Sequence, residues 1–361
     1  MSEKSPGIAS EAPPTLKREP SLFPKRSLVL TIVGVGLVCF AMFTWCRNSS
    51  VQRNLETLST EPSGLVKNDI GDVSPDDRRP STGGRQQYPG AIIIGVRKGG
   101  TGAMLRFLNM HPELSCSLRC CFSDRGFMNV EAHTGRELHY FDNNNHYAKG
   151  PQWYLSRMPA TSGRQLTVEK TPGYFHTRPV PARVKRLLPD AKFILLVREP
   201  VERAVSDYTQ IAVQKKFRGK PYDRFEQIAF EEDSNEINTK YNAVQVGLYH
   251  KHMRNWLQHF PRRQFLVIDS DRFVSQPLDE LKRVEAFLGL SSWFNSSHLK
   301  YDPTKGFYCP VRQNGRLKCL GVSKGRAHLP VADWALTRLR EFYAPKNARF
   351  CALVNITAAW C

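Results

Sequence analysis

A lysine and a threonine stand among four glycines in the segment GVRKGGTG, Gly95–Gly102. The N–H groups of a glycine-rich loop can surround a phosphate, the ammonium group of Lys98 can neutralise it, and the hydroxyl of Thr101 can donate a hydrogen bond to it. The loop differs from the nucleotide-triphosphate motif GxxxxGK[ST], because Gly100 stands where that motif has its lysine. These residues therefore predict a phosphate-binding loop of another kind, with an ordinary tight strand-to-helix turn as the alternative.

Arg198 and Ser206 form a second set of residues that can bind an anion. Arg198 directly follows the apolar run KFILLV, Lys192–Val197, and Ser206 lies eight residues later in a helical pattern. A guanidinium group and a hydroxyl at these places can hydrogen-bond to the same phosphate. Taken alone, the two residues favour an ion pair and a helix cap. The neighbouring glycine loop is what favours a phosphate.

Strands and helices alternate along the chain from Tyr88 onward. The apolar runs that predict strands are Ala91–Ile94, Gln165–Glu169, Lys192–Val197 and Gln264–Asp269. The helical patterns are Ala103–Leu108, Val180–Leu188, Glu202–Val213, Gly247–His259, Glu280–Leu288 and Val331–Tyr343. This alternation predicts an α/β fold with a central parallel sheet flanked by helices. The loops with Lys98, Lys170 and Arg198 each follow a predicted strand, so they should meet at the carboxyl edge of the sheet, where such folds bind ligands.

The positive charge of the chain indicates a polyanionic partner. The 361 residues carry a formal net charge of +19, and 41% of them are hydrophobic, which is enough for a large core. Residues 1–26 contain five basic and three acidic residues, and residues 47–88 contain six of each. Subtraction leaves 41 basic and 24 acidic residues in 89–361, a net charge of +17 on the globular part. Nucleic acid, an anionic membrane and a sulfated polysaccharide all fit this charge, and a merely soluble basic surface is the alternative.

The N-terminal part predicts a membrane anchor and a stem. Residues 1–26 are rich in proline, serine and charge and should form a disordered cytosolic tail. The uncharged run 27–46 is long enough to cross a bilayer as a transmembrane helix. Lys25 and Arg26 before it favour an uncleaved signal-anchor, and a cleaved signal peptide is the competing interpretation. Residues 47–87 then predict a flexible lumenal stem, and residues 88–361 the globular domain.

Two further patterns fit a lumenal or extracellular domain. Glycosylation sequons occur at Asn48, beside the predicted span, and at Asn295 and Asn355. Cys309 and Cys319 flank a short stretch with an Asn-Gly turn near its middle, so they are the disulfide candidates.

The remaining cysteines do not predict a metal site. Cys116, Cys120 and Cys121 with His133 could be proposed as zinc ligands, but they lack the paired spacing of such sites. We expect no metal, and these cysteines stay unassigned.

Six segments in fixed order resemble a known family. They are GVRKGGT, RELHYFD, VEKTPGYF, LVREPVERAVSDYTQ, GFYC with a later cysteine, and SKGRAH. From about Tyr88 to the C-terminus, the chain resembles the heparan sulfate glucosamine 3-O-sulfotransferases. The resemblance implies a P-loop-like sulfotransferase domain, and a type II protein of the Golgi membrane with a lumenal catalytic domain. It also implies transfer of a sulfuryl group from 3′-phosphoadenosine 5′-phosphosulfate (PAPS) to the 3-OH of a glucosamine in heparan sulfate.

The resemblance assigns residues to two substrates. The 5′-phosphosulfate would lie on the glycine loop and the 3′-phosphate on Arg198 and Ser206. The donor-binding residues that it implies are Lys98, Gly99, Gly100, Thr101, Gly102, Arg198, Ser206, Tyr308, Lys324, Gly325, Arg326, Ala327 and His328. The acceptor-binding residues that it implies are Glu137, Leu138, His139, Tyr140, Phe141, Asp142, Asn143, Lys170, Thr171, Pro172, Gly173, Gln210, Trp256 and Leu257.

Glu137 matches the position of the catalytic base in that family. A sugar hydroxyl is a poor nucleophile, so a carboxylate should take its proton as the new S–O bond forms. If the segment is extended, alternation places Glu137, His139 and Phe141 on one side, where His139 could orient the carboxylate or act as the base itself. Lys98 could stabilise the charge on the leaving phosphate oxygen, and this chemistry needs no metal. A surface carboxylate paired with Arg136 is the alternative.

The chain departs from the family in two places. Gly102 stands where the family usually has arginine, which removes a cation near the substrates. The segment Ser115–Arg136, with its cysteines, is longer than the family's connection, and it could be a lumenal loop with its own disulfide or retained extra sequence. A catalytically impaired heparan sulfate-binding protein and a related N-sulfotransferase are therefore the competing functions, and a lumenal nucleotide kinase is disfavoured by the missing lysine. The preferred acceptor saccharide and the oligomeric state do not follow from the sequence.

Overall fold

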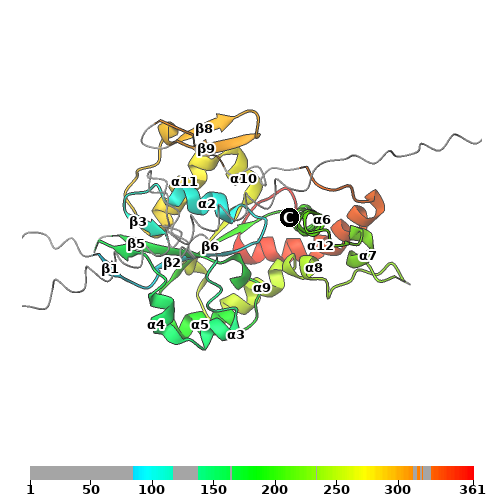
Figure 1. The fold of residues 1–361 in the computed structure, drawn as a ribbon, viewed down its shortest axis with the longest axis horizontal. Helices are drawn as coiled ribbons and strands as arrows, with labels where there is room; N and C mark the ends of the chain where they lie inside the picture. The colour runs from blue at the N-terminus through cyan, green and yellow to red at the C-terminus, as the bar shows by residue number, and fades with distance from the viewer. Residues whose placement is uncertain are drawn as a thin grey trace, which may run out of the picture. The chain divides into compact units, whose positions relative to one another are not determined.

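A five-stranded parallel sheet lies at the centre of the globular unit, Pro80–Cys361 (Figure 1). The computed structural model describes residues 84–116, 137–162, 165–232, 234–311, 315–317, 319 and 327–361. The strand order is β3-β5-β2-β6-β7, and every neighbouring pair is parallel. The strands are β3 (Leu114–Cys116), β5 (Leu166–Lys170), β2 (Ala91–Gly95), β6 (Lys192–Val197) and β7 (Phe265–Asp269).

Helices cover both faces of this sheet, which explains why its strands are continuous apolar runs. Alternate residues of β2 enter different cores: Ile92 and Ile94 join one buried cluster, and Ala91 and Ile93 join the other. The helices on the first face include α4 (Gly150–Leu155), α5 (Val180–Leu187) and α9 (Tyr249–Leu257). The second face is covered by α2 (Thr101–Leu108), α10 (Ser270–Ser275) and α11 (Pro277–Leu288).

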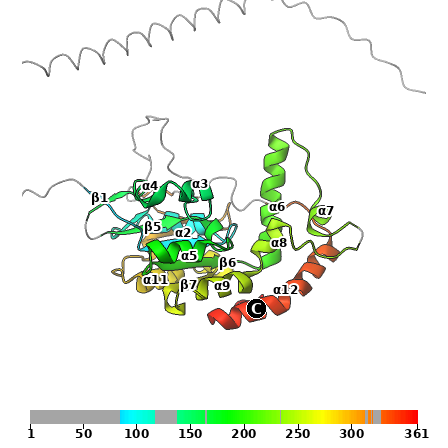
Figure 2. The same ribbon diagram turned by 90° about the horizontal axis from the view of Figure 1, so that it is seen from below.

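A third cluster joins four helices beside the sheet (Figure 2). They are α6 (Pro200–Phe217), α7 (Phe225–Ala229), α8 (Asn242–Val246) and α12 (Asp333–Val354). Two residues separate the end of β6 from the start of α6. Pro200 occupies the first turn of this helix, and the Glu199 carboxylate accepts a hydrogen bond from the Glu202 N–H at 2.6 Å. The functional residues of α6 are thereby placed next to the carboxyl edge of the sheet.

Short elements complete the unit. Two antiparallel pairs are present, β1 (Arg85–Gln86) with β4 (Ala160–Thr161), and β8 (Leu299–Asp302) with β9 (Phe307–Pro310). The other short helices are α3 (Asn144–Tyr147), η1 (Pro172–Tyr174), η2 (Arg262–Gln264) and η3 (Ser296–His298). Disulfides join Cys309 to Cys319 and Cys351 to Cys361. Since β1 pairs with β4, the last residues of the predicted stem belong to the globular unit.

The predicted α/β architecture is confirmed, with differences at particular elements. β3 was not predicted, and it contains Ser115 and Cys116 from the segment expected to be a loop. The last helix was expected to end at Tyr343, yet α12 continues through Pro345 to Val354. Phe350, Cys351 and Val354 are buried in the core that contains α9, so tertiary packing outweighs the missing proline N–H.

The predicted tail, membrane span and most of the stem lie outside the described residues. Within the part that is described, no helix has both the length and the apolar character to cross a bilayer.

Candidate functional site

The glycine loop connects β2 to α2 at the carboxyl edge of the sheet and packs closely against Ser270 and Leu196. The Ser270 hydroxyl donates a hydrogen bond to the Gly99 carbonyl at 2.8 Å. A Cβ at Gly99 would lie 2.8 Å from the Leu196 carbonyl oxygen, so only glycine fits there. Gly100 has a φ of 88° immediately before α2, a conformation that glycine adopts without strain. The first N–H groups of α2 are therefore available to an anion.

These groups open into a cavity of about 590 Å³ that gathers most of the predicted donor residues. Its lining includes Lys98, Gly100, Thr101, Gly102, Arg198, Ser206, Tyr308, Ala327 and His328. Gly99 supports the loop without lining the cavity, whereas Lys324, Gly325 and Arg326 lie outside the described residues. The loop, the start of α6 and the β8–β9 hairpin thus surround one space.

The cavity has an electrostatic preference for anions. Among the described residues that line it, the cations are those of Lys98, Arg106, Arg198 and Lys305, and the single carboxylate is that of Asp271. Burial and then the charge of Arg198 lower the pKa of His328 below its usual range. This cavity fits a ligand with several phosphate or sulfate groups, since charge-assisted hydrogen bonds from such side chains are strong.

Two contacts tie the glycine loop to α6. The Lys98 ammonium donates a hydrogen bond to the Gln210 side-chain oxygen at 3.0 Å. The Arg97 guanidinium pairs with the buried Asp207 carboxylate at 2.7 Å. Gln210, predicted to bind the acceptor, is therefore hydrogen-bonded to Lys98, predicted to bind the donor.

Four charged side chains form a continuous array at the end of β5. Lys170 Nζ donates to Glu137 Oε1 at 2.7 Å, and His139 Nε2 lies 3.4 Å from Glu137 Oε2. On its other side, His139 Nδ1 lies 2.8 Å from Asp142 Oδ2. This order, lysine–glutamate–histidine–aspartate, is the arrangement expected of a carboxylate oriented for proton transfer.

The array sets the charge of its two central members, Glu137 and His139. Burial raises the pKa of Glu137, but the hydrogen bond from His139 and the charge of Lys170 together outweigh it and lower the pKa to about 2. Hydrogen bonds to Asp142 and Glu137 raise the pKa of His139 to about 10. At neutral pH the carboxylate is ionised and the imidazole is protonated. Of these two residues, Glu137 is therefore the one able to accept a proton.

A buried network supports the array from beneath. Glu169, fully buried on β5, accepts hydrogen bonds from the Thr171 hydroxyl at 2.6 Å and the Tyr154 hydroxyl at 3.0 Å. The His139 N–H donates to the Thr171 oxygen at 3.4 Å, and the Tyr140 N–H donates to the Tyr174 hydroxyl at 3.1 Å. Glu169 was not among the site residues predicted from the sequence. An acidic residue inside an otherwise apolar strand was the signal that could have found it.

Gly173 leaves room for this array. A Cβ on Gly173 would lie 2.5 Å from Asp142 Oδ2 and 3.6 Å from His139 Nδ1. Close packing against Asp142 therefore leaves no room for a side chain at this position.

The segment with Glu137, His139 and Phe141 is not extended, so the alternation expected of an extended segment does not occur. His139 has a left-handed backbone with φ of 48°, so the chain turns there and is not extended. Phe141 and Tyr140 consequently enter an aromatic core with Tyr154, where both are buried. Glu137 and His139 still meet, but through this turn.

Several residues that were predicted to bind the acceptor instead pack in the core or cap a helix in this structure. Trp256 is fully buried, donates its indole N–H to the Phe175 carbonyl at 3.0 Å and packs on Phe193, because it lies on the apolar face of α9. The structure does not bring Trp256 to the site. Leu257 packs partly buried against the same core, and the Asn143 side chain caps α3. Leu138 packs partly buried against this core too, and Pro172 is buried at the start of η1.

The two departures from the family pattern have different structural outcomes. A Cβ at Gly102 would meet nothing within 4 Å, and Gly102 lines the cavity described above, so the position is open. Cys116 is a free, buried thiol whose pKa burial raises to about 12. Residues 117–136, with Cys120, Cys121 and His133, lie outside the described residues.

Comparison with known proteins gives a consistent result. A family model described as a sulfotransferase domain matches residues 89–343. The chain is 43% identical over 276 residues to mouse heparan sulfate glucosamine 3-O-sulfotransferase 5, covering 76% of this chain and 75% of the relative. It is 42% identical to mouse heparan sulfate glucosamine 3-O-sulfotransferase 3B1, covering 78% and 67%, and 40% identical to the human form 6, covering 77% and 75%.

A solved structure shares the fold. The sulfotransferase from Alicyclobacillus acidocaldarius superimposes with a TM-score of 0.54 at 20% identity, covering 76% of this chain and 99% of that one. At this identity, the similarity describes the architecture alone.

Proposed function

The chain belongs to the heparan sulfate glucosamine 3-O-sulfotransferases, a family of PAPS-dependent transferases, and we propose that it sulfates the 3-OH of a glucosamine unit in heparan sulfate. One observation carries the proposal. The Lys170–Glu137–His139–Asp142 array ends β5 while the anion-binding cavity begins at β2, and these two strands are neighbours in a parallel pair. A proton acceptor and a site for a polyanionic donor are thereby provided at the same edge of the sheet.

The donor residues divide by the group that each would hold. The N–H groups of the loop, with Lys98 and Thr101, would bind the 5′-phosphosulfate of PAPS, and Arg198 with Ser206 would bind the 3′-phosphate. The residues Lys324–His328 and Tyr308 would close over the nucleotide. The cationic lining of the cavity supports this assignment.

Glu137 would act as the general base. Its carboxylate takes the proton of the 3-OH as that oxygen forms a bond to sulfur and the bond from sulfur to the phosphate oxygen breaks. Lys98 then neutralises the charge that remains on the departing phosphate. His139, protonated and held by Asp142, fixes the orientation of Glu137. Binding, positioning and charge stabilisation supply the rate enhancement, as in phosphoryl transfer.

Asp142 and Lys170 offer further contacts to the sugar. Asp142 Oδ1 is buried and has no hydrogen-bond partner among the described residues, so an acceptor hydroxyl can donate to it. Lys170 can exchange its contact with Glu137 for a sulfate or carboxylate of the acceptor. Such an exchange would raise the low pKa of Glu137 and make it a better base at the moment of reaction.

The chain is also proposed to be a type II glycoprotein of the Golgi membrane, anchored by residues 27–46, with heparan sulfate as its partner and no role in nucleic-acid binding. Asn295 and Asn355 are exposed and so accessible to glycosylation. After expression in secretory cells, glycosidase treatment should increase the mobility of the chain on a gel. A protease-accessible C-terminus on intact microsomes would contradict this topology.

The direct test is to incubate the purified chain with radiolabelled PAPS and heparan sulfate and to map the label by disaccharide analysis. Label on the 3-O position supports the proposal. Label on glucosamine nitrogen would show N-sulfotransfer instead. Binding of heparan sulfate without transfer would show an impaired enzyme, for which the lost cation at Gly102 is the first explanation.

A further inference from the structure

A disulfide fastens the segment after α12 to the globular unit. It joins Cys361 to Cys351, which is buried on α12 in the core that contains α9. The Asn347 side chain, also buried on α12, donates a hydrogen bond to the Trp360 carbonyl at 3.2 Å. These two links hold Trp360 against the unit although it lies beyond Val354, the last residue of the helix.

The ring of Trp360 packs against two buried aromatic rings. It stacks on Phe350, with 6.3 Å between the ring centroids and 17° between the planes, and it meets Tyr249 edge-on at 6.0 Å. The Tyr249 hydroxyl donates a hydrogen bond to the Arg198 carbonyl at 2.8 Å. Trp360 therefore contacts the residue that holds the backbone of Arg198, which lines the anion-binding cavity, here called the donor cavity.

The indole N–H of Trp360 reaches a second support of the donor cavity. Nε1 donates a hydrogen bond to Asp269 Oδ1 at 3.4 Å, and Asp269 is the last residue of β7. Burial raises the pKa of Asp269, and the hydrogen bond from the indole opposes this shift, so it favours the ionised carboxylate. The next residue, Ser270, is buried, and its hydroxyl donates to the Gly99 carbonyl of the glycine loop.

A hollow of about 640 Å³ lies between Trp360 and the donor cavity. Its lining includes Trp360, Asn347, Glu202, Arg198 and Asp271. Arg198 and Asp271 line the donor cavity as well, so the two spaces meet at these two residues. Trp360 does not line the donor cavity itself, and any effect that it has on a bound donor must pass through its neighbours.

We propose that Trp360, held by its disulfide, is a positioning residue for the sulfuryl donor. Through Asp269 and Ser270 it fixes the glycine loop, and through Tyr249 it fixes the backbone of Arg198. Several N–H groups and a guanidinium must meet one ligand at the same time, so a small displacement of either support weakens binding. This inference rests on the proposed function, because it takes PAPS as the donor.

A contribution to stability alone is the alternative, since a partly buried tryptophan stabilises any fold. The two interpretations differ in where a substitution acts. Loss of stability alone increases opening of the whole unit, whereas loss of positioning acts on the glycine loop and on nucleotide binding.

The test uses two substitutions in the full chain and one matched control. Trp360→Phe removes the indole N–H and keeps an aromatic ring beside Phe350. Cys361→Ser opens the disulfide and releases the segment. The control is Trp334→Phe, because Trp334 lies on α12, is 46% exposed and packs on Phe230 in the third cluster.

Hydrogen exchange of the nucleotide-free chain measures the positioning directly. The Gly99 and Ala103 N–H groups are hydrogen-bonded to the Val96 and Gly100 carbonyls, each at 2.9 Å. In Trp360→Phe, exchange in a peptide covering 96–104 should be about 2- to 10-fold faster, the range for loss of one net hydrogen bond.

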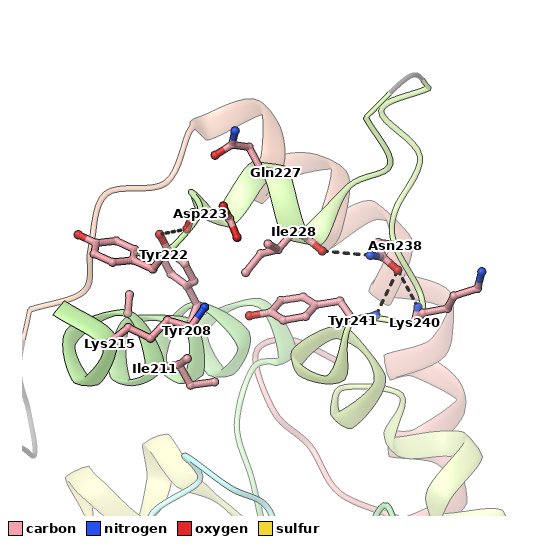
Figure 3. Close-up of a pocket in the computed structure, with 11 residues that line it drawn as sticks. Tyr208, Ile211, Lys215, Tyr222, Asp223, Gln227, Ile228, Asn238, Lys240 and Tyr241 are labelled. Atoms are coloured by element: carbon pink, nitrogen blue, oxygen red, sulfur yellow. Dashed lines mark hydrogen bonds between the residues drawn. The ribbon is translucent and has the colours of Figure 1, made fainter. Parts of the chain in front are cut away.

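A separate hollow of about 470 Å³, between α6 and the segment that contains α7, supplies the internal reference (Figure 3). Tyr222, Asp223, Gln227 and Ile228 line it, and among the described residues it shares no lining residue with the donor cavity. Exchange in a peptide covering 222–230 should therefore be unchanged in Trp360→Phe.

Calorimetric binding of the product nucleotide, 3′-phosphoadenosine 5′-phosphate, measures the consequence. Trp360→Phe should raise its Kd by about 2- to 10-fold, and Cys361→Ser should raise it at least as much. KM for heparan sulfate should be unchanged, because the contacts of Trp360 lead to the donor cavity. Trp334→Phe should change the nucleotide Kd by less than about twofold, the scale of a surface substitution.

A double-mutant cycle tests the connection through Ser270. Ser270→Ala should weaken nucleotide binding by itself, because it removes the hydrogen bond to the Gly99 carbonyl. If Trp360 acts through Ser270, then Trp360→Phe should weaken binding less in the Ser270→Ala protein than in the wild type. Fully additive losses would overturn this route.

Three other results would overturn the inference: a wild-type nucleotide Kd in Trp360→Phe, an equal loss in Trp334→Phe, or equally faster exchange in the 222–230 peptide. The last result would assign Trp360 to stability alone. Faster exchange confined to the 96–104 peptide, in a chain whose wild type binds no nucleotide, would support the positioning of the loop and refute the proposed function separately.

Discussion

Gly173→Ala tests whether the contact between His139 and Asp142 matters for catalysis. The new methyl carbon would lie 2.5 Å from Asp142 Oδ2, whereas ordinary contact begins at 3.4 Å, so the carboxylate must move by about 1 Å. The backbone at Gly173 has no positive φ, and alanine is therefore compatible with the fold. The substitution acts on Asp142 while leaving Glu137, Lys98 and the donor cavity untouched.

The magnitude follows from the hydrogen bond that is lost. The bond from His139 Nδ1 to Asp142 Oδ2 is 2.8 Å long and charge-assisted, a class worth about 1.5–3 kcal/mol. If the loss appears in the transition state, kcat falls by about 10- to 150-fold, similar to the effect of a 1 Å misplacement of a catalytic group. Binding of the product nucleotide should not change.

The assay is steady-state sulfation of heparan sulfate, with calorimetric binding of the product nucleotide and thermal unfolding as controls. Asn145→Ala in α3 is the matched control, because its side chain is exposed and makes no hydrogen bond to the described residues. A Gly173→Ala enzyme with wild-type kcat would refute the role given to Asp142. A loss of kcat accompanied by unfolding would instead show that Gly173 contributes to the stability of the fold alone.

Three further substitutions test other parts of the site. Gly102→Arg adds a cation at an open position beside the donor cavity and should tighten nucleotide binding by about 1.5- to 5-fold, as measured by calorimetry. Weaker nucleotide binding would show that a side chain at residue 102 does not favour the donor. Asp142→Asn removes the main cause of the raised pKa of His139. In the wild type, the protonated His139 contributes stability that is complete below about pH 6.5 and is lost as pH rises toward 10. The variant should therefore lose less stability than the wild type over that range. Equal slopes of unfolding free energy against pH in the two proteins would contradict the role given to Asp142. Cys309→Ser opens the loop to Cys319 and should lower the unfolding free energy by about 2–3 kcal/mol in denaturant titration, and no change would show that the bridge does not stabilise the chain.

The sheet and the donor side could be predicted from the sequence because they depend on local signals. β2 and β6 are continuous apolar runs, and their buried backbones leave little choice of structure. The polar residues that follow such strands are brought together by the parallel topology itself, which is why Lys98, Arg198 and Ser206 line one cavity as expected. The pair chosen for a disulfide, Cys309 and Cys319, is also the pair that the structure joins.

The positions of the predicted acceptor residues could not be predicted from the sequence, because they depend on contacts between residues that are distant in the sequence. The left-handed turn at His139 is stabilised by two contacts, one with Thr171, which is distant in the sequence, and one with Asp142, which follows the turn. Trp256 was assigned to the acceptor by resemblance, but the apolar stripe of α9 decides its burial. Glu169 went unnoticed because a buried acid becomes meaningful only when its partners, Thr171 and Tyr154, are known.

The most direct test of the central claim is Glu137→Gln, measured for transfer and for binding together. Glutamine keeps the shape of the side chain but cannot take a proton, so kcat should fall by about 10²-fold or more while binding of product nucleotide and of heparan sulfate is retained. Arg198→Ala, the contrasting variant, should weaken nucleotide binding itself, since it lines the donor cavity. A Glu137→Gln enzyme with near-normal kcat would contradict the account, because the protonated His139 could not replace the missing base.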